Sequence, residues 1–332
     1  MNNITITVLV GRNQENLLRL YESIKLLTIV PYEIVLVIDK ANSIEFDESS
    51  FLLSDVSVIF LYVENKRQPY MRNLGLKHAT GNYVWFIDDD VTLKNDSLFN
   101  LSKLINNIKS DQKIGCIAGK IIEVKDFVKN FKKPINFTFF RGFIGDFSID
   151  KKSLNERYFS FIEIGTDNYP IVLHAQGTSM IFNREMLMTV SGFDEDLDYG
   201  YCSFEDTDPC LALFKEKLVT IYASEIELTH HKLIRIGGIT RGYDNYTYQS
   251  SFIRNFIIVM YKNKYPRKYL CFINISAFIF FHFIRILKYN GFFKIKKGFF
   301  NVMYNSTKSV FSGVRLGLAT LSKSTNRINT QF

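Results

Sequence analysis

Three consecutive carboxylates, Asp88, Asp89 and Asp90, follow the apolar and aromatic run YVWFI. Adjacent negative charges repel one another, and a hard divalent cation with oxygen ligands is the usual compensation. Along an extended backbone Asp88 and Asp90 project to one side and Asp89 to the other. The pattern predicts a cation held by the outer pair, with Asp89 directed to a sugar or ribose hydroxyl. A solvated acidic turn without a ligand is the alternative, and the buried strand predicted just before the acids favours function.

A second acidic pair, Glu205-Asp206, lies in the segment FEDTD, which follows the motif GFDE at residues 192–195. Because adjacent side chains point in different directions, one carboxylate of the pair is available to a substrate. A single carboxylate base is what an inverting displacement at an anomeric carbon requires, since it removes the proton of the attacking hydroxyl. The alternative is an acidic cap for a helix that begins near Asp208-Pro209, and the pair taken alone favours that alternative.

Two further residue types could complete such a site. His230-His231 follow the apolar-rich run 218–228, and a neutral imidazole can add to a metal site begun by carboxylates. Arg72, at the start of a predicted helix, carries the paired donors that bind a diphosphate. Both residue types are also common on protein surfaces, so neither is diagnostic by itself.

The elements that would position these residues follow an α/β pattern. Apolar β-rich runs alternate with helix-like stretches, which is typical of a mainly parallel sheet flanked by helices. The sequence predicts strands over residues 4–10, 33–38, 58–63 and 83–87, and helices over 15–27 and 70–78. In an open α/β sheet ligands bind beyond the carboxyl ends of the strands, which is where Asp39 and the three aspartates fall.

Beyond residue 120 the pattern is less regular. Residues 121–175 mix Lys-rich and aromatic segments, and we expect them to form a variable insertion over the site. Order returns at residues 174–182, and a helix over 184–190 and a turn at Ser191-Gly192 are predicted to follow.

The C-terminal part of the chain differs in composition. The 332 residues, 47% hydrophobic and 22% charged, are enough for one catalytic domain plus an appendage. Asp244 is the last acidic residue, and residues 245–332 carry 14 Lys and Arg. These bases alternate with apolar and aromatic runs, which indicates an anionic membrane surface rather than nucleic acid. The sequence therefore predicts a catalytic domain over 1–244 and a basic, helical, membrane-associating region over 245–332.

The apolar stretch Tyr269–Ile284 is shorter than the ~20 residues that span a bilayer, so we expect a helix lying in the membrane plane. A packed helical subdomain is the alternative. The start of the chain lacks the pattern of a secretory signal, and the four cysteines show neither a CxxC spacing nor a disulfide framework. These features predict a cytoplasmic protein associated peripherally with the inner face of the cytoplasmic membrane.

The order of these motifs resembles glycosyltransferase family 2, whose fold is called GT-A. The matching stretches are PYEIVLVID at 31–39, RNLG at 72–75, WFIDDD, GTSMIFNRE, GFDE, FEDTD and THH, and together they cover residues 4–231. The resemblance implies a GT-A domain, an α/β fold with a Rossmann-like, mainly parallel sheet flanked by helices.

The resemblance also implies roles in donor binding. Asp39 would contact the nucleobase and Arg72 would lie near the nucleotide. The three aspartates would bind the ribose, the diphosphate and the metal. Asp90 would be the direct metal ligand, with Asp88 beside it and Asp89 as the third acid. The implied cofactor is Mn²⁺ or Mg²⁺, and the implied donor is a nucleoside-diphosphate sugar.

On the acceptor side the resemblance implies that Asp206 is the base that activates the acceptor hydroxyl, while His230 approaches the metal and diphosphate. The implied reaction is inverting sugar transfer to a glycan or lipid-linked acceptor in bacterial cell-surface polysaccharide synthesis. The chain departs from the family pattern at Val10–Asn13 and at Ile38–Lys40, both at the nucleobase end of the site.

Two other functions fit part of the pattern. A nucleotidyltransferase also uses an α/β sheet and metal-binding carboxylates, but it would normally have a Gly-rich phosphate loop near its start, and none is present. A catalytically inactive, membrane-associated glycan- or nucleotide-binding protein would keep the fold without turnover. The presence of both acidic sites disfavours this second alternative.

Overall fold

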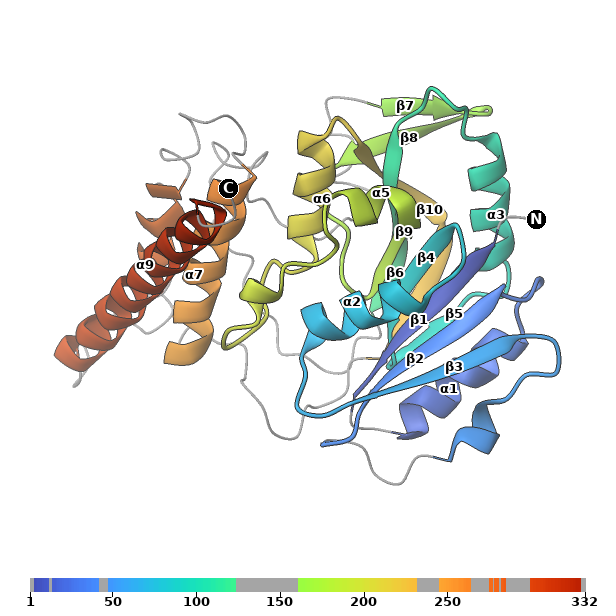
Figure 1. Cartoon of the computed structure of the whole chain (residues 1–332), viewed down its shortest axis with the longest axis horizontal. Coiled ribbons are helices and arrows are strands. Elements are labelled where there is room, and N and C mark those ends of the chain that lie inside the picture. The colour runs from blue at the N-terminus through green and yellow to red at the C-terminus, as the bar shows by residue number, and fades with distance from the viewer. Residues whose placement is uncertain are drawn as a thin grey trace. The chain divides into compact units, whose positions relative to one another are not determined.

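The computed structural model describes residues 3–11, 14–41, 47–123, 161–231, 245–263, 275–276, 278–280, 282–284 and 299–329 (Figure 1). The chain forms two compact units. The first comprises Met1–Phe193 and Pro209–Ile234, and the second comprises Asp194–Asp208 and Arg235–Phe332. Most of the predicted insertion, half of the stretch Tyr269–Ile284 and the basic segment 291–298 lie outside the described residues.

The first unit is built on four adjacent parallel strands, as predicted. They are β1 (Ile4–Val10), β2 (Glu33–Asp39), β3 (Ser57–Val63) and β4 (Tyr83–Asp88), in the order β3-β2-β1-β4. Every residue of β1 and β2 is buried, including the polar Thr5 and Thr7 of β1, as expected of parallel strands that are covered on both faces. The carboxyl ends of β2 and β4 therefore lie at one edge of the sheet, on either side of β1.

The sheet continues from β4 with strands of mixed direction. Its order beyond β4 is β9 (Ser179–Asn183), β6 (Ile114–Glu123), β10 (Val219–His230), β8 (Asp167–Val172) and β7 (Phe161–Ile164), and β5 (Val91–Leu93) pairs separately with β10. Strand β9 is antiparallel to both β4 and β6, whereas β10 is parallel to β6. The described ends of the irregular segment 121–175 are thus regular strands rather than a loop.

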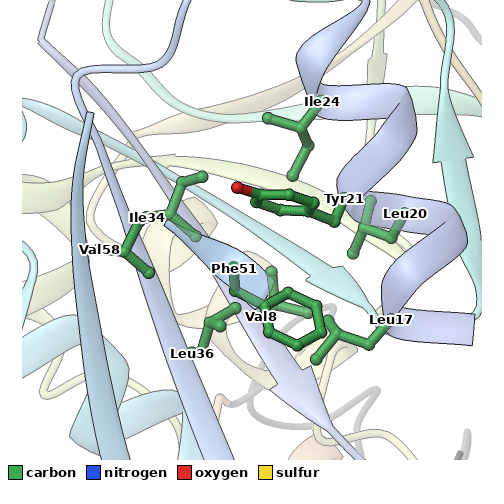
Figure 2. A pocket seen from close by; sticks show the side chains of 9 residues that line it. All are labelled: Val8, Leu17, Leu20, Tyr21, Ile24, Ile34, Leu36, Phe51 and Val58. Carbon is green, nitrogen blue, oxygen red and sulfur yellow. The ribbon is translucent and has the colours of Figure 1, made fainter. Parts of the chain in front are cut away.

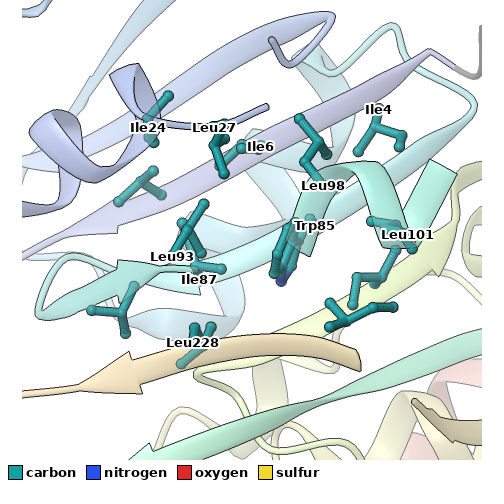
Figure 3. Close-up of a cluster of buried hydrophobic side chains, with 14 of the residues drawn as sticks. Ile4, Ile6, Ile24, Leu27, Trp85, Ile87, Leu93, Leu98, Leu101 and Leu228 are labelled. Atoms are coloured by element: carbon teal, nitrogen blue, oxygen red, sulfur yellow. The ribbon is translucent and has the colours of Figure 1, made fainter. Parts of the chain in front are cut away.

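Helices bury an apolar core on each face of the sheet. In β1, Ile6 and Val8 belong to one core, whereas Leu9 belongs to the other, because side chains alternate along a strand. The first core packs against α1 (Gln14–Lys25) and α3 (Ser97–Asn107), and Figure 3 shows Trp85 and Leu98 within it. The opposite face carries α2 (Gln68–His78), α5 (Arg184–Thr189) and part of α6 (Thr207–Lys215).

Helix α1 leaves a small apolar pocket over the sheet, shown in Figure 2. Its lining includes Val8, Leu17 and Phe51, and the hydroxyl of Tyr21 donates to the backbone oxygen of Leu52. No charged side chain lines this pocket, so we assign it to core packing rather than to a ligand.

The second unit contains α7 (Tyr246–Lys262) and α9 (Phe299–Asn329), so the predicted helical C-terminal region is confirmed. Helix α7 is buried along most of its length, and α9 packs closely against it. A Cβ atom at Gly313 of α9 would lie 2.7 Å from the backbone oxygen of Ser250. None of the helices among the described residues combines the length and the apolar character needed to cross a membrane.

Candidate active site

The structure brings together the three residues predicted to bind metal. Asp88 ends β4, Asp90 lies in the turn before β5, and His230 ends β10. Their ligand atoms all lie within 4.8 Å of one another. Strand pairing explains this meeting of residues so distant in sequence, because β5 pairs with β10 so that His230 lies opposite Val91. In addition, the backbone N–H of His231 donates to the backbone oxygen of Asp90 (2.8 Å).

The donor set of these residues fits a divalent cation. The Nε2 atom of His230 lies 3.3 Å from Oδ1 of Asp90, and within the described part of the protein its buried Nδ1 atom has no hydrogen-bond partner. Carboxylate oxygens suit hard cations such as Mg²⁺ and Mn²⁺, and an imidazole suits first-row transition metals. Mn²⁺ satisfies both preferences.

The neighbouring His231 has a different role. Its Nε2 lies 3.0 Å from Oγ1 of Thr92, so the ring links the end of β10 to β5. Burial lowers the pKa of His231 below its ordinary value, and the charge of Arg19 acts in the same direction. The histidine pair seen in the sequence thus divides into one residue that faces the acids and one that fixes the strand pairing.

Arg72 lies behind Asp88. Its side chain is only 1% exposed, so the surface position considered from the sequence is wrong. Its Nη2 atom forms an ion pair with Oδ1 of Asp88 at 4.0 Å. The same atom donates a hydrogen bond to the backbone oxygen of Gly177 (3.3 Å). The other carboxylate oxygen of Asp88 accepts a hydrogen bond from Thr178 (3.2 Å). The carboxylate of Asp88 is therefore held by a buried cation and a hydroxyl.

Asn73, next to Arg72, connects this region to the GFDE motif. Its side-chain amide donates to the backbone oxygen of Phe193 (2.8 Å) and accepts from the backbone N–H of the same residue (2.9 Å). The guanidinium of Arg72 lies over the ring of Phe193, 5.6 Å from its centroid. Before this segment the chain turns at Ser191 and Gly192, both with positive φ as the predicted turn requires. Asn73 was not among the residues predicted for the site, although its place in the stretch RNLG was a signal.

Asp89 points away from the cluster, toward the end of β1. Its Oδ2 accepts a hydrogen bond from the backbone N–H of Gly11 (2.6 Å), and a Cβ atom at Gly11 would lie 3.3 Å from that oxygen. Burial raises the pKa of Asp89 to about 7, and the neighbouring carboxylates add to this effect while the Gly11 N–H opposes it. Asp89 thus fastens the acidic turn to the adjacent strand, and its predicted contact with a ribose stays a prediction.

Asp39 lies at the same edge of the sheet, at the end of β2. Its Oδ1 accepts from the backbone N–H groups of Asn65 (2.9 Å) and Ala41 (3.2 Å), so the carboxylate fixes two loops that follow neighbouring strands. Its contact with a nucleobase also stays a prediction.

The predicted base, Asp206, belongs to the second unit. Glu205 is 5% exposed, whereas Asp206 is half-buried and accepts a hydrogen bond from the hydroxyl of Thr207 (3.3 Å). Phe204, just before the pair, has a φ of 66°, which turns the chain sharply at this point. Of the two acids, Asp206 is therefore the more accessible to a substrate.

Comparisons with known proteins give two kinds of match. The family model described as glycosyl transferase family 2 matches residues 5–190. Among solved structures, TarS 1–349 of S. aureus in complex with UDP-GlcNAc superposes with a TM-score of 0.59 and 15% identity, covering 94% of this chain and 81% of that chain. No curated protein sequence matches the chain.

Two further structures are similar. The mannosyltransferase PcManGT from Pyrobaculum calidifontis, in complex with GDP-Man and Mn²⁺, gives a TM-score of 0.52 at 14% identity, covering 96% of this chain and 87% of that one. GalNAc-T7 with UDP, GalNAc and Mn²⁺ gives 0.52 at 13% identity, covering 77% and 48%. Because the sequence identities are this low, the similarity to these structures is evidence for the fold only. It confirms the predicted fold class.

Proposed function

Since the chain belongs to glycosyl transferase family 2 and is a glycosyltransferase of the GT-A fold, we propose that it transfers a sugar, with inversion, from a nucleoside-diphosphate sugar to a hydroxyl group of a glycan or lipid-linked acceptor. The main support for this proposal is that the side chains of Asp88, Asp90 and His230 lie close together at the carboxyl ends of the strands. The complexes of TarS with UDP-GlcNAc and of PcManGT with GDP-Man support the donor class.

Asp88, Asp90 and His230 would hold the cofactor, Mn²⁺ or Mg²⁺, and the complexes of PcManGT and GalNAc-T7 contain Mn²⁺. When bound, the cation supplies positive charge for the departing diphosphate. Arg72 keeps the carboxylate of Asp88 in place and reduces the repulsion among the three aspartates. In this proposal Asp39 contacts the nucleobase, Asp89 reaches the ribose while it anchors the acidic turn, and Arg72 acts close to the nucleotide.

Asp206 acts as the general base. Its carboxylate takes the proton of the acceptor hydroxyl while that oxygen forms a bond to the anomeric carbon. The bond from the anomeric carbon to the diphosphate breaks on the opposite face, and its electron pair leaves with the diphosphate. Attack and departure on opposite faces give inversion. The greater accessibility of Asp206 compared with Glu205 supports this choice of base.

The outer face of α9 supports association with a membrane. Tyr304, Phe311 and Leu318 are 65%, 71% and 57% exposed, and their spacing of seven residues places them on one face of the helix. The exposed bases Lys308 and Arg315 lie between them along the same face, and residues 245–332 contain no acid. Apolar side chains with basic neighbours suit an anionic lipid surface.

The helix can serve this purpose and still pack against α7 with its other face, so the membrane-associating region and the packed helical subdomain are compatible. We therefore propose peripheral association with the inner face of the cytoplasmic membrane, where a lipid-linked acceptor for bacterial cell-surface polysaccharide would be presented. Nucleic acid is not expected as a partner, because the basic residues are interleaved with apolar ones.

A donor panel tests the function. The full chain is incubated with UDP-, GDP- and other nucleoside-diphosphate sugars and a lipid extract of bacterial membranes, with Mn²⁺, Mg²⁺ or EDTA. We expect labelled sugar to enter the lipid fraction from one donor class, with release of the nucleoside diphosphate, only when the cation is present. Absence of turnover with every donor would instead support the catalytically inactive alternative, and release of pyrophosphate from sugar phosphate and a nucleoside triphosphate would support nucleotidyl transfer.

A further inference from the structure

The segment Asp194–Asp208, which carries Glu205 and Asp206, has little regular structure of its own. Apart from the 3₁₀ turn η3 (Glu195–Leu197) and the start of α6, it follows an irregular path. Two of its residues, Gly200 and Phe204, have positive φ values of 61° and 66°. A backbone conformation of this kind in a residue other than glycine persists only where the surroundings hold it. We call this segment the acidic loop.

Asn255 of α7 holds the middle of the acidic loop. It is fully buried, and its side-chain Nδ2 donates to the backbone oxygens of Leu197 (2.9 Å) and Ser203 (3.1 Å). One amide thus joins two points of the loop, the second only three residues before Asp206. The neighbouring Arg254 donates from Nη1 to Oδ1 of Asn255 (2.6 Å) and to the backbone oxygen of Asp196 (2.8 Å).

Lys262, near the end of α7, joins the two ends of the acidic loop. Its Nζ lies 2.8 Å from a carboxylate oxygen of Asp194 and 2.8 Å from one of Asp208. Asp208 is 1% exposed and also accepts from Nδ2 of Asn263 (2.8 Å). A buried carboxylate requires such partners. The position of Asp208, two residues after Asp206, therefore depends on the C-terminal end of α7.

An aromatic contact fixes the residue next to the acidic pair. The centroid of the Phe204 ring lies 4.8 Å from that of Phe252 and 5.6 Å from that of Phe256. Asn255 and Phe256 follow Phe252 by three and four residues, so all three lie on one face of α7. This face contacts the acidic loop just before Asp206, and the end of the helix contacts both ends of the loop, at Asp194 and at Asp208.

We propose that α7 is the positioning element of the acidic loop, and that Asn255 and Lys262 are positioning residues that hold Asp206 in the orientation for proton removal. The inference rests on the proposed role of Asp206 as base. It gives the C-terminal region a part in the transfer step that is separate from any attachment to a membrane. Fixed orientation matters because a displacement of about 1 Å in a reacting group can cost about a hundredfold in rate.

The test compares Lys262→Gln with Lys262→Arg in the full chain, using a detergent-solubilised acceptor so that membrane binding has no influence. The side chain of Lys262 is 40% exposed, so the substitutions are tolerated by the fold more readily than a change at a buried site. Lys215→Gln, which removes an exposed lysine in the last turn of α6, is the control for loss of charge. Asn255→Ala is the second variant.

We expect Lys262→Gln and Asn255→Ala to lower kcat by about tenfold to a hundredfold while the Kd for the donor nucleotide stays unchanged. Lys262→Arg should restore most of the rate, and Lys215→Gln should have none of these effects. A purely structural role would reduce the amount of folded protein and leave kcat per folded molecule unchanged, which would overturn the inference. An equal loss in Lys215→Gln would overturn it as well.

Asp206→Asn, measured in parallel, separates this inference from the proposed function. If Asp206→Asn keeps full transfer activity, the assignment of the base fails whatever the Lys262 variants show. If Asp206→Asn loses transfer while Lys262→Gln and Asn255→Ala keep normal kcat, the base assignment stands and the positioning role of α7 is wrong.

Discussion

Each of the three consecutive aspartates has a different partner. Asp88 is held by Arg72 and Thr178, Asp89 by the backbone of Gly11, and Asp90 lies beside His230. The repulsion expected among three adjacent carboxylates is therefore reduced at each residue by separate contacts. Only the outer two acids share a space with His230, and this arrangement suits one cation rather than several.

At the residue scale, the base assignment gives a direct prediction. Asp206→Asn removes the proton acceptor but keeps the size of the side chain, so transfer should fall by about a hundredfold or more while donor binding stays nearly normal. The measurement is kcat together with the Kd for the donor nucleotide. Glu195→Gln, an exposed acid of the same loop, is the matched control and should keep wild-type values. Retained transfer in Asp206→Asn would remove this residue from the role.

Glu33 gives a prediction about stability. This buried carboxylate at the start of β2 accepts hydrogen bonds from Thr5 (2.6 Å) and from the backbone N–H and hydroxyl of Thr80 (2.5 and 2.9 Å). Burial acts to raise its pKa, but these bonds outweigh burial and lower the pKa overall. The stabilisation is therefore present above the ordinary pKa of a glutamate and is lost as the pH falls through the lowered value.

We expect Glu33→Gln to reduce the free energy of unfolding by about 2 kcal/mol at neutral pH, because the hydrogen bonds to a charged acceptor are weakened. The difference from wild type should shrink at acidic pH, as the pH falls through the lowered pKa of Glu33. Urea unfolding at the two pH values measures both quantities, with the exposed Glu64→Gln as control. An equal difference at both pH values would show that the charge of Glu33 does not contribute.

At the element scale, the predicted parallel strands and the helices beside them are confirmed because their signals are local. Continuous apolar runs indicate buried parallel strands, and the alternation of side chains separated Asp89 from the outer aspartates. The sequence could not indicate that β5 and β10 pair, nor that Gly11 meets Asp89, because these contacts join residues far apart in the chain. The burial of Arg72 was missed for the same reason.

The acidic loop shows the same limit. The change in composition at Asp244 marks where acidic residues end, but hydrogen bonds from Asn255 and Lys262 join residues 194–208 to the C-terminal helices. No pattern in the sequence of the loop predicts these contacts. Long-range side-chain contacts, rather than local periodicity, decide which part of the protein carries Asp206.

The packing of α7 against α9 gives a prediction at this scale. Gly313→Val should separate the helices, because the backbone oxygen of Ser250 at 2.7 Å and Cβ of Ile253 at 2.8 Å leave no room for a side chain. We expect a loss of about 3 kcal/mol in the stability of the second unit. Ser312→Val, at the adjacent half-exposed position, is the control.

Circular dichroism and tryptophan fluorescence distinguish the two units in this experiment. The only tryptophan, Trp85, lies in β4 of the first unit, so its fluorescence reports the unfolding of that unit. The helical signal of Gly313→Val should be lost at lower denaturant concentration while the fluorescence transition stays in place. A helical transition unchanged from wild type would contradict the close packing of these two helices.

At the scale of the whole molecule, the two units have different tasks in this account. The first contains the donor and metal residues, and the second contains the base and the exposed face of α9. Because the second unit also holds the acidic loop, loss of the C-terminal region should abolish transfer even for an acceptor in detergent. Membrane binding and catalysis should nevertheless be separable by substitutions on the outer face of α9.

We predict that the double variant Phe311→Ser/Arg315→Glu binds vesicles containing anionic lipid at least about tenfold more weakly than wild type, because it loses apolar contact and reverses a charge. The matched control, Leu26→Ser/Lys25→Glu, makes the same changes at exposed positions of the first unit. Co-sedimentation with vesicles at low and high salt measures binding. Equal binding by both variants would show that this face of α9 is not the attachment surface.

We propose above all that Asp88, Asp90 and His230 form the metal site that serves the donor diphosphate. Electron paramagnetic resonance of Mn²⁺, titrated into the protein with the nucleoside diphosphate of the preferred donor, tests this claim without depending on turnover. We expect one bound Mn²⁺ per chain in wild type and in the control Asp111→Asn, whose side chain is exposed. We also expect Asp90→Asn to weaken Mn²⁺ binding by at least about tenfold. Wild-type Mn²⁺ affinity in Asp90→Asn would contradict the metal site.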